Sequence, residues 1–103
     1  MNYGIKLAAT AAMLGICAGA YAGDADAGRS KSATCAACHG PTGTSTNPLW
    51  PNLAGQKEAY LAKQIQAFRD GGRSDPSMTA MVAALSDEDV ADLAAFFAAQ
   101  SCE

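Results

Sequence analysis

The order of apolar and polar positions after residue 22 predicts helices joined by loops, because no stretch alternates apolar and polar residues as a half-buried strand does. A first helix is expected to begin at a cap on Asp24 or Asp26 and to run to about Thr34. Residues 40–51 hold three prolines, two glycines and a run of Thr and Ser, so this stretch is expected to be a loop.

A second helix is expected from about Gln56 to Phe68, ended by Gly71 and Gly72. Its apolar face at helical spacing is Tyr60, Leu61, Ile65 and Phe68. Residues 69–77 are expected to form another loop because Asp75 precedes a proline. A short helical turn is then expected over residues 78–84.

The last helix has the clearest start signal. Ser86 is the expected N-cap, and the acidic residues that follow suit the positive end of a helix dipole. Its buried face is expected to consist of Val90, Leu93, Ala94 and Phe97. The pattern as a whole predicts an all-α domain with three main helices and short helical turns.

The first 22 residues have the pattern of a secretory signal peptide. Lys6 precedes an Ala-rich apolar run over residues 7–18, and Ala20-Tyr21-Ala22 matches an A-x-A cleavage site. The apolar run is short for a membrane span, so no stable membrane anchor is expected. We therefore expect a signal peptide at 1–22, one domain at 23–103 and export to the periplasm.

Composition limits the mature part to one small, weakly acidic domain. Removal of Lys6 leaves six of the seven basic residues and all ten acidic ones, a formal charge of −4. The basic residues are dispersed, so no nucleic-acid partner is expected. A domain this small is only marginally stable unless a further group supports its core.

Residues 35–39, Cys-Ala-Ala-Cys-His, are the strongest chemical signal. C-x-x-C-H is the attachment signature of a c-type haem: Cys35 and Cys38 can form thioethers with one haem, and His39 can ligate its iron. A thioredoxin-like redox pair would need a βαβ context. A zinc site would need further ligands, and His39 is the only histidine. We expect one covalent haem c.

The second axial position decides between an electron carrier and a catalyst. Met78 and Met81 are the candidate thioether ligands, with Met81 as the alternative to Met78. Met78 is expected to emerge from a loop that could bring sulfur to iron. Met81 is expected on the core-facing side of the helical turn.

The chain resembles the class I cytochromes c, specifically the small bacterial monohaem type similar to one half of a dihaem cytochrome c4 (the c553/c4 group). The resemblance covers essentially all of the mature chain. It rests on three stretches: residues 35–40 (CAACHG), residues 51–56 (PNLAGQ), and Met78 followed by residues 85–89 (LSDED) and 93–97 (LAAFF). It implies the class I cytochrome c fold, in which helices wrap around one covalent haem.

The resemblance also implies roles for single residues. Met78 stands at the position of the ligating methionine, and the Pro51 carbonyl is expected to accept a hydrogen bond from the His39 imidazole. Gly28 is expected where the first and last helices cross, against Phe96 or Phe97. Trp50 and Tyr60 are expected to line the haem pocket, although aromatic residues in a small domain also fill cores.

These inferences predict a periplasmic one-electron carrier, not an enzyme, that meets redox proteins in transient encounters. The alternatives are a cytochrome subunit of a larger oxidoreductase and a haem enzyme with an open sixth site. Cys102 is expected to have no intramolecular partner, because Cys35 and Cys38 would be bound to haem and Cys17 would leave with the signal peptide. It either links two chains in a disulfide dimer or packs against the first helix.

Overall fold

The computed structural model describes residues 22–102, and these residues form helices and loops without a strand. The helices are α1 (Ala25–Lys31), α2 (Ala33–His39), α3 (Glu58–Asp70), α4 (Pro76–Val82) and α5 (Asp87–Ala98). The all-α prediction is therefore confirmed. The proposed signal peptide, apart from Ala22, and Cys17 within it lie outside the described residues.

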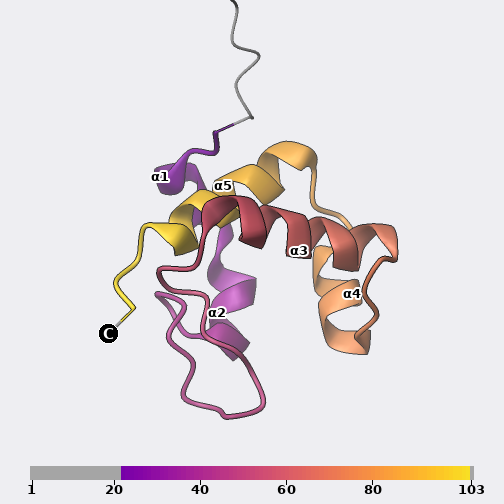
Figure 1. Ribbon diagram of the computed structural model, residues 1–103, viewed down its shortest axis with the longest axis horizontal. Helices are drawn as coiled ribbons and strands as arrows, with labels where there is room; N and C mark the ends of the chain where they lie inside the picture. The colour runs from indigo at the N-terminus through magenta and orange to yellow at the C-terminus, as the bar shows by residue number, and fades with distance from the viewer. Residues whose placement is uncertain (1–21, 103) are drawn as a thin grey trace, which may run out of the picture.

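Helix α5 forms the centre of the domain (Figure 1). Both α1 and α3 pack on it, and α4 packs on α3. The expected apolar face is buried as predicted, and the burial extends around most of the helix; the buried residues are Val90, Asp92, Leu93, Ala94, Ala95, Phe96 and Phe97. A helix enclosed on several sides cannot show a simple two-sided pattern, which is why the periodicity revealed only part of this core.

Ser86 starts α5 as predicted. Its hydroxyl accepts a hydrogen bond from the Asp89 N–H, and the Asp89 carboxylate accepts one from the Ser86 N–H, both at 3.0 Å. This reciprocal pair satisfies two backbone donors that the first helical turn leaves free.

The crossing of α1 and α5 depends on Gly28, as expected. A Cβ at Gly28 would lie 2.0 Å from the Asp92 carbonyl oxygen and 2.7 Å from the Phe96 Cβ. Only a residue without a side chain allows this approach. The two phenylalanine rings of α5 then pack edge to face, with centroids 5.0 Å apart.

An ion cluster lies beside this crossing. The Lys31 Nζ is 2.7 Å from an Asp92 carboxylate oxygen and 2.9 Å from an Asp89 carboxylate oxygen. The other Asp92 oxygen accepts a hydrogen bond from the Asp24 N–H at 2.8 Å. The Lys31 ammonium holds the pKa of Asp92 below its usual range and lowers that of Asp89 to about 2. The burial of Asp92, which is 3% exposed, was not predicted from the sequence.

The expected single helix before the cysteine motif is wrong, because the chain forms α1 and α2 with a break at Ser32. Ser32 is buried, and its hydroxyl donates to the Arg29 carbonyl oxygen at 2.8 Å. A side chain that bonds the preceding turn competes with the regular helical pattern. The break lets α2 leave the surface of α5. The predicted cap at Asp24 is confirmed, since its carboxylate accepts from the Asp26 and Ala27 N–H groups.

The second predicted helix is present as α3, shifted by two residues at each end, and it ends at Gly71 in the left-handed conformation with φ 92°. Helix α4 begins at Pro76, so the expected loop through residue 77 is too long. Asp75 caps α4 by accepting from the Ser77 and Met78 N–H groups, and Pro76 occupies the first turn, where proline fits a helix well. In residues 22–102 no helix has the length and apolar character that crossing a membrane requires.

Candidate haem-binding site

His39 is the last residue of α2 and is only 7% exposed. Its Nδ1 lies 2.8 Å from the Pro51 carbonyl oxygen. A carbonyl can only accept, so the Nδ1 atom carries the proton and donates it. The Nε2 atom therefore keeps its lone pair, which is the form that ligates a metal ion. The hydrogen bond that the class I resemblance implied is present.

The loop after α2 holds the Pro51 carbonyl in place. Gly40 (φ 85°) ends α2, and the Gly43 carbonyl accepts from the N–H groups of Leu53 and Ala54 at 2.7 and 3.0 Å. Farther along the chain, the Gly55 N–H donates to the Phe97 carbonyl at 3.0 Å. The loop is thus closed on itself and tied to the C-terminal end of α5.

Gly43 has to be glycine for two reasons. Its φ is 84°, in the left-handed region. A Cβ there would also lie 2.8 Å from the Ala54 nitrogen and 2.8 Å from the Phe97 ring. The loop therefore crosses directly over the core at this point.

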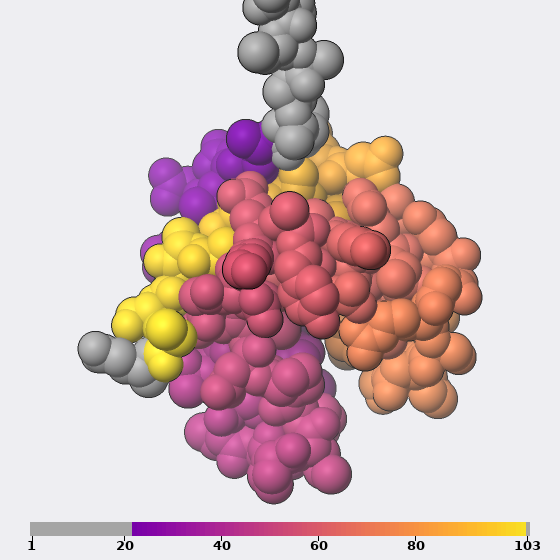
Figure 2. All heavy atoms as spheres, in the orientation of Figure 1, coloured from indigo at the N-terminus to yellow at the C-terminus, as the bar shows by residue number. Residues whose placement is uncertain are grey.

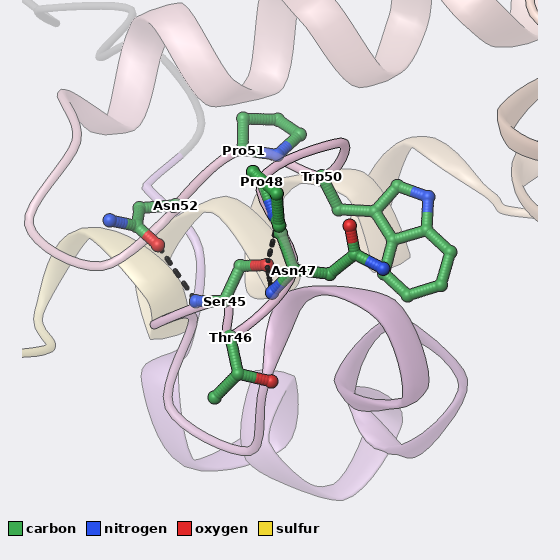
Figure 3. A pocket seen from close by; sticks show the side chains of 7 residues that line it. All are labelled: Ser45, Thr46, Asn47, Pro48, Trp50, Pro51 and Asn52. Carbon is green, nitrogen blue, oxygen red and sulfur yellow. Dashed lines mark hydrogen bonds between the residues drawn. The ribbon is translucent and has the colours of Figure 1, made fainter.

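A second brace within the loop was not found from the sequence. The Asn52 side-chain oxygen accepts from the Ser45 N–H at 2.7 Å, and the Ser45 hydroxyl accepts from the Asn47 N–H at 3.1 Å (Figure 3). Asn and Ser commonly bond nearby backbone in turns, but that tendency does not identify a partner seven residues away.

These loop residues enclose a shallow pocket of about 460 Å³, open to one side. Its walls are formed by Ser45, Thr46, Asn47, Pro48, Trp50, Pro51 and Asn52. The Trp50 indole lies beside the Asn47 amide in Figure 3. The pocket adjoins the site through Pro51, whose carbonyl accepts from His39, and through Ser45, whose hydroxyl donates to the Cys38 carbonyl at 3.4 Å.

Cys35 and Cys38 are one helical turn apart on α2, and both are half-buried free thiols. Burial raises the pKa of the Cys35 thiol, and a hydrogen bond with the Thr34 side chain acts in the opposite direction. Cys35 also packs against the core cluster that contains Leu93 and Phe97. Two thiols on one face, followed by a histidine that offers Nε2, fit the donor set of a covalent haem c.

Met78 lies in the first turn of α4 and not in the loop before it. It is half-buried, whereas Met81 is 54% exposed. The expectation that Met81 faces the core is wrong, since Val82 takes that position at 4% exposure. Residues 81 and 82 are consecutive in the helix and point about 100° apart, so Val82 can face the core while Met81 faces solvent.

Trp50 and Tyr60 are not core residues, because they are 42% and 49% exposed. The alternative prediction that these two aromatic residues fill the core is therefore wrong. Tyr60 also leaves the predicted apolar face of α3, where only Leu61 and Phe68 are fully buried. Next to Trp50, Leu49 is 83% exposed. A large aliphatic side chain so exposed contributes nothing to the core.

Two further observations bear on the chemistry. No cluster of three or more His, Cys, Asp and Glu side chains suited to a metal ion occurs within residues 22–102, so the zinc alternative has no support there. The chain also carries no Asp, Glu, Lys or Arg between Lys31 and Lys57. We call α2 and the following loop, residues 32–56, the uncharged lobe; Figure 2 shows its magenta atoms gathered at one end of the described structure.

Comparison with known proteins agrees with this donor set. The family model "Cytochrome c" matches residues 25–101. Cytochrome c4 of Pseudomonas aeruginosa is 53% identical over 79 residues, which are 77% of this chain and 39% of that protein. Cytochrome c-554(548) of Halomonas halodenitrificans is 50% identical over 82 residues, 77% of this chain and 99% of that protein.

A solved structure of a cytochrome c4 is also similar to this chain. The crystal structure of reduced recombinant cytochrome c4 from Pseudomonas stutzeri superposes with a TM-score of 0.75 at 47% identity, over 78% of this chain and 47% of that one. The chain thus spans about two-fifths of the Pseudomonas aeruginosa relative and nearly all of the Halomonas one. Family match, fold and Cys-x-x-Cys-His motif together support one covalent haem c, and the chain belongs to the cytochrome c family.

Proposed function

We propose that this chain is a one-electron carrier whose covalent haem is ligated by His39 and Met78. The single observation that supports it most is the buried His39 ring, which donates from Nδ1 to the Pro51 carbonyl and so presents Nε2. A His/Met-ligated haem supplies an Fe(III)/Fe(II) couple whose potential the thioether raises.

Each of these side chains has its own proposed role in holding the haem. The Cys35 and Cys38 thiols would hold the haem by adding across its two vinyl groups, and Pro51 fixes the orientation of His39 in the structure without haem. Pre-oriented ligands reduce the rearrangement that accompanies a change of charge on the metal. Met78 of α4 would supply the second iron ligand, and Figure 1 shows α2 and α4 extending from the same side of α3. Met81 remains the alternative ligand, and Trp50 and Tyr60 remain proposed pocket residues.

We further propose that residues 1–22 are a signal peptide and that the domain 23–103 works in the periplasm. In that compartment the chain would exchange electrons with redox proteins in brief encounters. The uncharged lobe supports this, because Leu49 and Trp50 offer apolar contact area close to His39 without fixed charges. Small apolar contacts permit fast dissociation.

The optical spectrum of the purified holoprotein tests the assignment. We expect a weak sulfur-to-iron band in the oxidised protein and no rapid binding of carbon monoxide by the reduced protein. Cys35→Ala and Cys38→Ala should each yield little stable covalent holoprotein, because each removes one thioether. Normal amounts of covalent haem from both variants would contradict the attachment residues.

The second candidate is a cytochrome unit of a larger oxidoreductase. Its support is the length of the relatives, since this chain matches only 39% of one cytochrome c4 and 47% of another. Stoichiometric co-purification with a larger protein would favour it. An enzyme with an open sixth site is the least supported candidate, and fast stoichiometric carbon monoxide binding would favour it.

Cys102 is exposed, and we propose that it links two chains under air. Its Sγ lies beside Gly55, where an added Cβ would be 3.2 Å away. The position beside the Gly55 loop replaces the alternative of packing against the first helix. Non-reducing electrophoresis of wild type and Cys102→Ser should show a dimer in wild type alone; a monomer with an unreactive native thiol would contradict the link.

A further inference from the structure

The two residues that lead into α1 are held tightly on α5. A Cβ at Gly23 would lie 1.9 Å from the Ala91 carbonyl oxygen and 2.2 Å from its carbon, so the Gly23 backbone touches the α5 backbone. The next residue, Asp24, donates its N–H to the buried Asp92 carboxylate at 2.8 Å. Consecutive contacts of this kind fix the position of the Gly23 nitrogen.

That nitrogen lies next to a carboxylate of another helix. The Gly23 N–H donates to Glu58 Oε1 at 3.4 Å, and Glu58 is the first residue of α3. Both meet at a shallow groove of about 340 Å³ between α3 and α5, which Ala22 also lines. The apolar part of the groove consists of Ala59, Ala62, Ala91 and Ala94.

Cleavage after Ala22 would change the chemistry of this nitrogen. Hydrolysis of the Ala22–Gly23 bond adds hydroxyl to the Ala22 carbonyl carbon and a proton to the Gly23 nitrogen. The neutral amide with one N–H then becomes an amine that is protonated near neutral pH, with one positive charge and three N–H donors. A weak hydrogen bond to Glu58 becomes a charge-assisted one.

We propose that Glu58 is the binding site of the mature amino terminus, and that the Gly23 ammonium formed by cleavage after Ala22 pairs with its carboxylate. The inference rests on the proposed signal peptide, but not on the proposed electron transfer. The pair ties the start of α1 to α3, while Asp24 ties it to α5. Three helices are thereby joined at a site that exists only in the processed chain.

The other charges around the ammonium are few. Lys63 of α3 lines the same groove and opposes the pairing. Asp92 of α5 favours it, but its charge is shared with Lys31. Asp24 and Asp26 of the segment itself add negative charge. Glu58 is the carboxylate within hydrogen-bond distance of the nitrogen.

The test uses purified holoprotein and measures the rate of α-amine acetylation against pH, followed by mass spectrometry of the N-terminal peptide. The matched variants are Glu58→Gln and Glu88→Gln, both in the exposed first turn of a helix. A carboxylate partner stabilises the charged amine. The apparent pKa of the amine should therefore be a few tenths of a unit higher in wild type and Glu88→Gln than in Glu58→Gln. Added salt should reduce the difference.

Two results would overturn the proposal, and they are distinguishable. A mature chain that starts at a residue other than Gly23 would refute the cleavage position. A Gly23 terminus whose amine titrates alike in wild type and Glu58→Gln would refute the pairing while leaving the processing intact. The haem spectrum, recorded on the same samples, reports on the proposed function separately.

Discussion

The orientation of His39 is determined by a carbonyl twelve residues farther along the chain. The Pro51 oxygen selects the protonated nitrogen and leaves the other free, so the ring needs no rearrangement to act as a ligand. Proline has no N–H, and its fixed φ limits the loop at this point. The orientation of the proposed ligand is thus set by a backbone carbonyl and not by another side chain.

The two methionines are expected to differ in their effects. Met78→Ala should abolish the sulfur-to-iron band and lower the reduction potential, because the thioether favours Fe(II). Met81→Ala should leave both unchanged and cost about 0.5 kcal/mol or less, as usual for an exposed side chain. Optical spectra and redox titration of the two variants decide the assignment. Loss of the band in Met81→Ala alone would show that Met81 is the ligand.

Sequence reasoning was most reliable where chemistry fixes the spacing between residues. The Cys-x-x-Cys-His motif depends on short distances along the chain, whereas the Pro51 partner of His39 was predicted through the resemblance to class I cytochromes c. The exposures of Trp50, Tyr60 and Met81 were not predicted. Exposure depends on which neighbours surround a side chain, and hydrophobicity alone does not provide that information.

Helix α5 is the shared partner of α1 and α3, so its surface decides the fit of both. On one side, Gly28 lets α1 approach to backbone contact. On the other, Leu61 of α3 joins Leu93 and Phe97 in the core cluster. A change in α5 therefore affects two helix pairs together.

Gly28→Ala should destabilise the protein by about 1–3 kcal/mol, because its Cβ would overlap the Asp92 carbonyl. Gly72→Ala is the matched control, since its Cβ would meet no atom closer than 3.6 Å. That change should be neutral or stabilising by up to about 1 kcal/mol. Urea unfolding of both holoproteins provides the measurement. Equal stability of the two variants would contradict the close crossing of α1 and α5.

The Lys31 cluster predicts a pH dependence. The folded-state pKa of Asp89 is about 2, and that of Asp92 is also lowered. Carboxylates with lowered pKa values stabilise the fold above their unfolded pKa of about 4, and this contribution is lost as the pH falls through the folded values. Lys31→Met should therefore be less stable than wild type at pH 7 and lose less stability between pH 4 and 2.

Thermal unfolding from pH 7 to pH 2 measures this effect, and Lys57→Met serves as the control. Lys57 is exposed and precedes α3, away from the cluster. Its variant should follow the wild-type pH profile. If the Lys31 variant also follows that profile, the cluster contributes nothing to stability.

The ends of helices are predicted correctly where the signal is a cap or a stop residue next to the helix. Ser86, Asp24 and Gly71 were recognised because capping and stopping depend on neighbouring backbone. The break at Ser32 was missed, since a serine within a helical pattern is compatible with both continuation and interruption. The early start of α4 was missed because Asp75-Pro76 was interpreted as a loop signal, although the same pair forms a cap followed by a first-turn proline.

Charge is distributed unevenly over the molecule. Among residues 22–102, the acidic and basic side chains lie on α1, α3 and α5, just before α1 and α3, and in the loop before α4, while the uncharged lobe carries the cysteine motif and Pro51. Encounters over such a lobe depend little on long-range steering. We therefore expect the approach of a redox partner to this lobe to depend on contact area more than on net charge.

Leu49→Asp places a charge on the uncharged lobe and removes its most exposed apolar side chain. We expect slower electron self-exchange between the reduced and oxidised protein, measured by NMR line broadening, with partial recovery at high salt. Gln66→Glu adds the same charge to exposed α3 and should have a smaller effect. Equal effects of both changes would indicate that net charge, and not the lobe, controls the encounter.

Helix α5 follows the other described helices along the chain, and this order has a consequence for folding. The contact between α1 and α5 joins segments about 60 residues apart, so closing it carries a large loop entropy. Without α5, neither α1 nor α3 has its main packing partner. Folding is therefore expected to wait until α5 has emerged, and Cys35 and Cys38 stay in unfolded chain until then, accessible for the proposed thioether formation.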